Sequence, residues 1–311
     1  MISVNESATK IVEKMIENKE ALSIEAFTLE NGAKVVDAGV DVTGGSRAGK
    51  YFTEACLGGL GNLYLTKDKR PRVQVSVDHP AIACMASQYA GWSIKVGDYY
   101  GIGSGPARAL ARVEDLFDDL DYRDDFDSAV LALETREIPG EEVAGYIAEK
   151  CGVKASNLYL LISPTASVVG SIQISGRVVE TGVHKLHELD FNIGSIITGI
   201  GSAPIAPVAG NDLEAMGKTN DCILYGGKTI YFVEGVEDSE IERIIEEVPS
   251  SASDDYGAPF LELFEKYDRD FFKIDPNLFS PSEIVINNLD TGRVFQAGRV
   301  NEEILKKSLG I

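Results

Sequence analysis

The chain has 311 residues, 44% of them hydrophobic and 25% charged, so a packed globular protein is expected and wholesale disorder is not. Its 49 acidic against 29 basic residues give a net charge of −20, which disfavours nucleic acid and anionic membranes as partners. No signal peptide and no run of roughly 18 apolar residues is visible, and the four cysteines lie far apart. We therefore predict a cytoplasmic protein with reduced thiols.

Short hairpins are predicted towards both ends of the chain. An amphipathic helix over 5–19 precedes the first of them. In each hairpin, two apolar runs flank a turn that contains glycine. We expect the terminal segments 1–59 and 251–311 to pack on the central part of the chain. The expected strand pairs are 24–29 with 34–40, and 283–289 with 293–300.

Short strings recur in the same order between these hairpins, which predicts an α/β fold with two related units, 60–152 and 155–250. Each unit ends on a polar turn and an amphipathic helix, over 141–150 and 239–247. Two similar units that face each other would leave a cleft between them, and such a cleft is the natural place for a ligand. The matched strings are Asn62–Leu65 with Asn157–Leu160, Gly101–Pro106 with Gly199–Pro204, and Val130–Glu134 with Ile230–Glu234.

A glycine-rich turn precedes a predicted helix in the first unit. It consists of Gly103, Ser104, Gly105 and Pro106, and Arg108 follows inside the helix. Glycines before a helix let backbone N–H groups approach an anion, and the arginine adds a bidentate donor for a phosphate or carboxylate. The alternative is a structural junction between a loop and a helix. The turn lacks the residues of a Walker loop and the glycine spacing of a dinucleotide site.

A polar stripe is predicted on a helix that follows Pro164–Ser167, where Thr165 or Ser167 is a suitable N-cap. A carboxylate held by an arginine stays ionised, and in a cleft it can take a proton from water. The ordinary alternative is a solvated face with a weak ion pair between Arg177 and Glu180. The stripe comprises Gln173, Arg177, Glu180, His184 and His187.

The spacing of His184 and His187 could fit a metal site. The chain has only three histidines and no cysteine near this pair, so the indication of metal binding is weak. Asp78 and His79 lie before a proline, and this pattern fits a structural strand end as well as a catalytic site. Three further polar strings are equally compatible with turns or with functional loops. They are Asn220–Asp221, Asp254–Gly257 and Lys273–Pro276.

Taken together, strings along the whole chain resemble methenyltetrahydromethanopterin cyclohydrolases. Their order from one end to the other is more specific than any single string. They are Ser3–Glu6, Asp78–Ala81, Ala90–Trp92, Gly103–Leu110, Pro164–Ser167, Gln173–Thr181, Ala215–Asp221, Asp255–Phe260 and Phe272–Pro276.

The resemblance implies a two-domain α/β subunit with a site between the domains, a homotrimer, and no metal or redox cofactor. It implies hydrolysis of a cationic 5,10-methenyl pterin carrier to the 5-formyl form. The family's catalytic arginine and glutamate correspond to Arg177 and Glu180. We expect the substrate to contact a further set of residues: Gly103, Ser104, Gly105, Pro106, Arg108, Asp78, His79, Thr165, Ser167, Asn220 and Asp221.

Two other functions are compatible with the sequence. One is an oligomeric protein that binds an anionic pterin-like metabolite without turning it over, through the turn that ends at Arg108. The other is a cyclohydrolase for a folate-type carrier. Turnover of the methenyl compound, and the preference between the two carriers, distinguish the three hypotheses.

Overall fold

The computed structural model describes residues 2–270 and 273–311, so the string that starts at Phe272 begins outside the described residues. The chain forms two compact units, and each draws on two separate stretches of sequence. Each unit contains one six-stranded sheet together with helices, which confirms the predicted α/β fold. Unit 1 comprises Met1–Asn62 and Ile82–Gln173; unit 2 comprises Leu63–Ala81 and Ile174–Ile311.

The sheet of unit 1 has the strand order β1-β2-β8-β7-β6-β5. Its three central strands β2, β8 and β7 are parallel, and antiparallel hairpins close both edges. The helix α5 (Glu141–Cys151) connects β7 to β8, as a parallel pair requires. The strands are β1 (Glu25–Thr28), β2 (Lys34–Asp37), β5 (Trp92–Val96), β6 (Tyr99–Ser104), β7 (Ala129–Glu134) and β8 (Leu158–Ser163).

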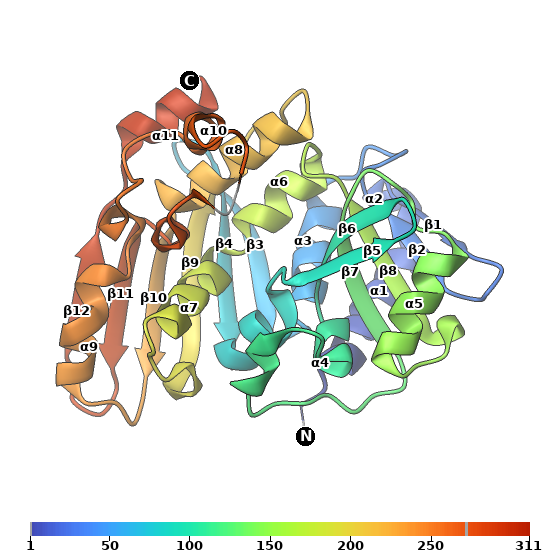
Figure 1. The fold of residues 1–311 in the computed structure, drawn as a ribbon, viewed down its shortest axis with the longest axis horizontal. Coiled ribbons are helices and arrows are strands. Elements are labelled where there is room, and N and C mark those ends of the chain that lie inside the picture. The colour runs from blue at the N-terminus through green and yellow to red at the C-terminus, as the bar shows by residue number, and fades with distance from the viewer. Residues whose placement is uncertain (1, 271–272) are drawn as a thin grey trace. The chain divides into compact units, whose positions relative to one another are not determined.

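Helices cover both faces of this sheet (Figure 1). Alternate side chains of β8 show why: Leu158, Leu160 and Ile162 join the core under α5, whereas Tyr159 and Leu161 join the core under α1 and α3. Strands buried on both faces read as continuous apolar runs, and β8 is buried at every position. The other helices of the unit are α1 (Val4–Glu17), α2 (Lys19–Leu22), α3 (Ser46–Cys56), a π-helix (Ala81–Gln88), α4 (Ala107–Ala111) and α6 (Val168–Ser175).

The first helix is fixed by polar contacts at its N-terminus. The Ser3 hydroxyl caps α1 by accepting from the Glu6 N–H at 3.1 Å. Asn5 is fully buried, and its amide donates to the Asp124 carboxylate and to the Pro106 carbonyl, both at 2.8 Å. Its carbonyl oxygen accepts from the Val130 N–H at 3.0 Å. The Ser3–Glu6 string therefore starts a helix and ties it to β7.

The sheet of unit 2 has the order β12-β11-β10-β9-β4-β3. β10 and β11 are parallel, whereas β9 runs antiparallel to both β10 and β4, and β12 runs antiparallel to β11. The strands are β3 (Gly61–Lys67), β4 (Pro71–Asp78), β9 (Ile196–Pro204), β10 (Lys228–Val233), β11 (Glu283–Asn288) and β12 (Val294–Gly298).

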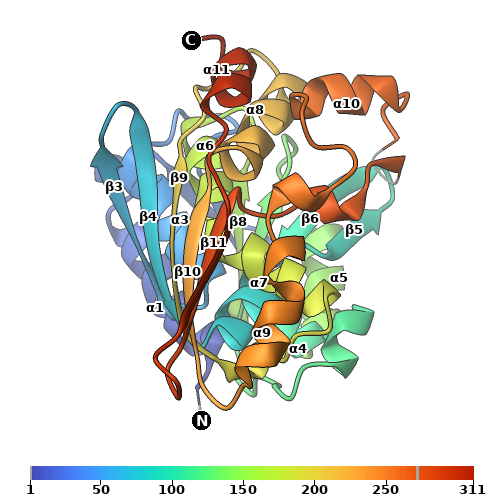
Figure 2. The same ribbon diagram turned by 90° about the vertical axis from the view of Figure 1, so that its left-hand side faces the viewer.

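One face of this second sheet is covered by helices, and α7 and α9 lie on the same side of β9, β10 and β11 (Figure 2). Side chains of β4 alternate accordingly, with Val73, Val75 and Val77 fully buried. On β10 the outward-facing Ile230 is 39% exposed. The helices of the unit are α7 (Val178–Glu188), α8 (Asp212–Leu224), α9 (Asp238–Ile244), α10 (Phe260–Lys266) and α11 (Glu302–Leu309).

The predicted hairpins and the helices near 5–19, 141–150 and 239–247 are confirmed, but the chain divides differently from the expected contiguous units 60–152 and 155–250. The hairpin β3–β4 pairs with β9 in unit 2, and β8 pairs with β7 in unit 1.

Part of the internal repeat is nevertheless present in the topology. The segment β6-α4-β7-α5-β8 has the same order and strand directions as β9-α8-β10-α9-β11. Two of the three matched strings fall on equivalent strands, whereas the match of Asn62–Leu65 with Asn157–Leu160 does not.

Candidate functional site

Arg177 and Glu180 lie together at the start of α7 in unit 2. Arg177 is the N-cap residue, and Glu180 belongs to the first helical turn, where the helix dipole favours a negative charge. The Arg177 Nη1 and Glu180 Oε2 atoms are 3.9 Å apart, and the two side chains are 11% and 8% exposed. The pair is therefore largely shielded from solvent and is not the exposed surface pair of the ordinary alternative.

The predicted single helix through this region is wrong, because the chain breaks between α6 and α7 at Gly176 and Arg177. The Ser175 hydroxyl donates to the Pro204 carbonyl at 2.8 Å, and the Arg177 N–H closes a tight turn on the Ile174 carbonyl. Gln173 therefore lies on α6, whereas Glu180, His184 and His187 lie on α7, so these residues do not share one continuous helical stripe.

Glycines on α7 and on β9 allow the helix to pack closely against the sheet of unit 2. A side-chain carbon at Gly182 would lie 2.1 Å from the Tyr231 hydroxyl, and one at Gly199 would lie 2.8 Å from Val179. Tyr231 is fully buried and donates to the Val179 carbonyl at 2.7 Å. These glycines are explained by the approach of a helix to strands β9 and β10.

The turn before α4 has the predicted loop-to-helix geometry, and Arg108 forms internal contacts beside it. The side chain is fully buried, and its guanidinium donates to the Glu114 carboxylate at 2.7–3.1 Å and to two backbone carbonyls at 2.9 and 3.0 Å. Ser104 is also buried, with its hydroxyl donating to the Gln88 carbonyl at 2.7 Å. Gly105 has a φ of +104°, which explains the glycine. These contacts fit the structural alternative, and the expected contact between Arg108 and the substrate tail stays a prediction.

Asp78 and His79 lie at the end of β4 in unit 2, and both are exposed. The backbone of His79 is left-handed, with φ of 51°, and its N–H donates to the Ile197 carbonyl at 3.2 Å. The strand ends at this conformation before the π-helix begins. These features are those of a strand end.

Thr165 and Ser167 follow β8 and build a tight turn in unit 1. The Ser167 hydroxyl lies 3.0 Å from the Ser163 hydroxyl and donates to the Pro164 carbonyl at 2.8 Å. It also accepts from the Gly170 N–H at 2.8 Å, which makes it a helix cap. The Thr165 hydroxyl points elsewhere and donates to the carboxylate of Glu134.

Glu134 is a residue that the sequence analysis did not select. It is the last residue of β7, and its second carboxylate oxygen accepts from the Gln173 amide at 3.3 Å. Glu134, Thr165 and Gln173 therefore form one polar cluster in unit 1. The available signal in the sequence is an acidic residue that ends the apolar run 129–133.

Asn220 and Asp221 lie on α8, and the structure gives them internal partners. The Asn220 amide donates to the Met216 carbonyl one helical turn earlier, at 2.8 Å. Asp221 is fully buried and accepts from the Phe260 N–H at 3.0 Å and from the Ser308 hydroxyl at 2.5 Å. Burial raises the pKa of Asp221 to about 7. Asp221 thus joins α8 to α10 and α11. Its expected contact with the substrate stays a prediction.

The remaining polar strings also form internal contacts. Asp255 accepts from the Tyr267 hydroxyl at 2.7 Å and from the Asp275 N–H at 2.9 Å, and Asp275 accepts from the Ser253 hydroxyl at 2.6 Å. Burial lowers the pKa of His184.

Within residues 2–270 and 273–311, no three His, Cys, Asp or Glu side chains gather as metal ligands would. No helix in these same ranges has the length and apolar character needed to cross a membrane.

Comparison with known proteins places these residues in a family. The family model described as Cyclohydrolase (MCH) matches residues 3–309. A methenyltetrahydromethanopterin cyclohydrolase of Methanocaldococcus jannaschii is 51% identical, over 100% of this chain and 99% of that protein. The proteins of the same name from Methanothermobacter marburgensis and Methanococcoides burtonii are 48% and 47% identical, over 100% of this chain and 99–100% of their own length. The chain belongs to the cyclohydrolase family.

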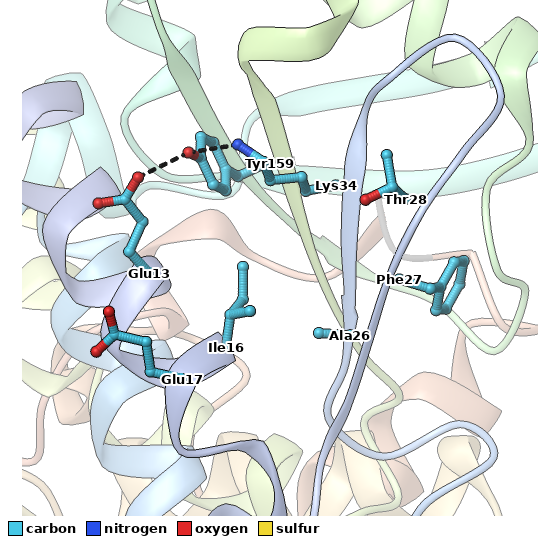
Figure 3. Close-up of a pocket in the computed structure, with 8 residues that line it drawn as sticks. All are labelled: Glu13, Ile16, Glu17, Ala26, Phe27, Thr28, Lys34 and Tyr159. Carbon is cyan, nitrogen blue, oxygen red and sulfur yellow. Dashed lines mark hydrogen bonds between the residues drawn. The ribbon is translucent and has the colours of Figure 1, made fainter.

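The family match spans both units, and it includes the Arg177–Glu180 pair and the Glu134 cluster. An open pocket of about 490 Å³ lies elsewhere in unit 1, at the amino ends of β2 and β8 (Figure 3). There the Lys34 ammonium donates to the Tyr159 hydroxyl at 2.7 Å, which in turn donates to Glu13 at 3.0 Å. None of the catalytic or substrate-binding residues predicted from the sequence lines this pocket. Glu134 lies at the opposite end of the sheet, where the parallel strands have their carboxyl ends.

Proposed function

We propose that this member of the cyclohydrolase family hydrolyses 5,10-methenyltetrahydromethanopterin to the 5-formyl compound in archaeal-type one-carbon metabolism. Full-length identity of 47–51% to relatives of that name supports the substrate and the reaction. The observation that carries the mechanism is the shielded pair at the start of α7, with Arg177 and Glu180 3.9 Å apart.

The reaction needs a water molecule to attack the methenyl carbon, which is the electrophilic centre of an amidinium-like cation. We propose that Glu180 takes a proton as the new C–O bond forms. One C–N bond then breaks, and the released nitrogen receives a proton. Loss of the remaining proton leaves the formyl group on the other nitrogen, so the net reaction consumes one water and releases one proton.

Arg177 has two proposed roles in this chemistry. Its positive charge stabilises the ionised form of Glu180, and its N–H groups orient the attacking water. A distance of 3.9 Å exceeds that of a direct hydrogen bond, so one water oxygen can hydrogen-bond with both side chains. A cation near a cationic substrate is unfavourable, and the net charge of −20 offsets this repulsion. The proposed steps require water and these two side chains, and no metal or redox cofactor.

The loss of the methenyl chromophore on adding the protein tests this proposal. We expect turnover of the methanopterin carrier and a clear preference for it over methenyltetrahydrofolate. Stoichiometric binding without turnover would indicate a binding protein, and a preference for folate would indicate the other carrier. Glu180→Gln keeps the size of the side chain and removes its basicity, so kcat should fall by about 10²–10⁴-fold.

The matched control for this variant is Glu188→Gln, on the same helix but with its side chain 54% exposed. It should leave kcat unchanged. Equal turnover by Glu180→Gln and the wild type would contradict the assignment of Glu180 as the base.

We further propose that the protein acts as a homotrimer in the cytoplasm. Exposed apolar side chains in unit 2 support an assembly, since they would be shielded between subunits. They include Tyr64 (58% exposed), Ile200 (37%), Ile230 (39%) and Val294 (62%). Sedimentation equilibrium should give three times the mass of the chain, and a monomer at micromolar concentration would contradict the proposal.

A further inference from the structure

We infer that Tyr231 is a positioning residue for Glu180, because its hydroxyl ties the peptide group that carries Glu180 to the sheet of unit 2. The inference rests on the proposed function for its reaction, and on contacts within unit 2 for its geometry. Tyr231 acts through Glu180 and is assigned no contact with the substrate.

The first argument is the hydrogen bond that joins β10 to α7. Tyr231 is fully buried, and its hydroxyl donates to the Val179 carbonyl at 2.7 Å. This carbonyl and the N–H of Glu180 belong to one planar peptide group. A bond that fixes the carbonyl therefore also fixes the backbone direction from which the Glu180 side chain departs.

The second argument is that this bond is additional to those that form the helix. In an α-helix a carbonyl accepts from the N–H four residues later, which for Val179 is that of Val183, also within α7. A carbonyl oxygen has two lone pairs, so the tyrosine hydroxyl uses the second one. Loss of the hydroxyl would leave the helix's own hydrogen bonds complete. The bond therefore sets where the first turn lies on the sheet, and not whether the turn forms.

The third argument is the fit of the tyrosine ring between two glycines. A side-chain carbon at Gly182 on α7 would lie 2.1 Å from the Tyr231 hydroxyl, and one at Gly199 on β9 would lie 3.1 Å from the edge of the ring. Close packing on both sides holds the ring in one place and so defines the position of its hydroxyl. Phenylalanine would keep the ring in this slot and remove only the hydrogen bond.

The position of a catalytic carboxylate matters because the reaction tolerates little displacement. Reacting groups must lie within about 0.5 Å of the productive geometry, and a shift of about 1 Å can lower a rate by about 10²-fold. The proposed water hydrogen-bonds with both Arg177 and Glu180, whose side-chain atoms are 3.9 Å apart. A displaced first turn of α7 would therefore move this water relative to the methenyl carbon.

Tyr231→Phe tests the inference through a double-mutant cycle on kcat. In the wild-type background this change should lower kcat by about tenfold and leave KM within about twofold, since Tyr231 is assigned no contact with the substrate. In the Glu180→Gln background, where the positioned base is absent, it should alter the residual kcat by less than about twofold. A purely structural role would give the same factor in both backgrounds, and that result would overturn the inference. An unchanged kcat in Tyr231→Phe would overturn it too.

Tyr225→Phe is the matched control for the loss of a buried hydroxyl. Tyr225 is also fully buried in unit 2, and its hydroxyl donates to the Ala258 carbonyl at 2.6 Å. This variant should lower Tm by an amount similar to Tyr231→Phe and keep the kcat of the wild type. Equal losses of kcat in the two variants would show that kcat follows stability, and would overturn the inference.

Rescue of the donor provides a second measurement. Replacement of Tyr231 by 4-aminophenylalanine returns an N–H donor to the position of the hydroxyl and should restore kcat towards the wild-type value. A kcat that stays at the level of Tyr231→Phe would count against the inference. The proposed function fails separately, if the wild type does not turn over the methenyl carrier or if Glu180→Gln turns it over at the wild-type rate.

Discussion

Replacement of Arg108 by methionine decides between the two roles that the sequence left open for it. The guanidinium is fully buried, and its partners are the Glu114 carboxylate and the carbonyls of Met85 and Ser87. Methionine keeps most of the apolar volume but leaves a largely buried carboxylate and two carbonyls without their donor. Breaking a buried ion pair in this way costs about 3–5 kcal/mol.

Thermal unfolding followed by circular dichroism converts this free energy into a measurable shift. For a unit of about 150 residues the entropy of unfolding is ~0.3 kcal/mol per degree, so Tm should fall by about 10–15 °C. The control is Arg123→Met, since Arg123 is exposed and its replacement should shift Tm by no more than a degree or two. An unchanged Tm in Arg108→Met, together with a raised KM, would refute the structural role and support the predicted contact with the substrate tail.

Three further predictions concern unit 2. Arg177→Ala should also impair turnover, and the double variant with Glu180→Gln should lose far less than the two single losses combined; additive losses in kcat would contradict a pair that acts as a unit. The raised pKa of Asp221 means that its contribution to stability is complete below pH 4 and is lost as the pH rises towards 7. Asp221→Asn should therefore gain stability relative to the wild type between pH 5 and pH 8 in urea titrations, and a constant difference would count against this. Gly182→Ala should cost about 1–3 kcal/mol through its clash with the Tyr231 hydroxyl, and Tyr231→Phe should restore part of this loss; absence of rescue in denaturant melts would disprove the contact.

Local patterns predicted the individual elements well, because helix and strand periodicities depend on neighbouring residues. The N-terminal helix, both terminal hairpins and the helix α5 are examples. The partner of a strand is not a local property. The apolar alternation of β4 is compatible with either sheet, and its pairing with β9 joins residues more than 100 positions apart.

In the candidate site too, contacts between residues close in sequence could be predicted, whereas contacts between residues far apart in sequence could not. Arg177 and Glu180 are close in sequence, so their proximity followed from helical spacing even though the helix begins at Val178. The role of Arg108 depends on Glu114 and on carbonyls some twenty residues away, and no spacing rule reports such partners. Glu134 was missed because its partners come from the turn after β8 and from α6, which only the fold brings beside the end of β7.

The hairpin β3–β4 has a consequence for synthesis of the chain at the ribosome. All residues of unit 1 have been added once Gln173 is reached, so that unit can fold early. The hairpin is made before this point, yet its neighbour β9 ends at Pro204, about 126 residues after Asp78. At about 5–20 residues per second, β4 waits for about 6–25 seconds with Val73, Val75 and Val77 exposed on one face. During this interval the nascent chain presents an apolar strand that other nascent chains can capture, and chaperone binding is most valuable there.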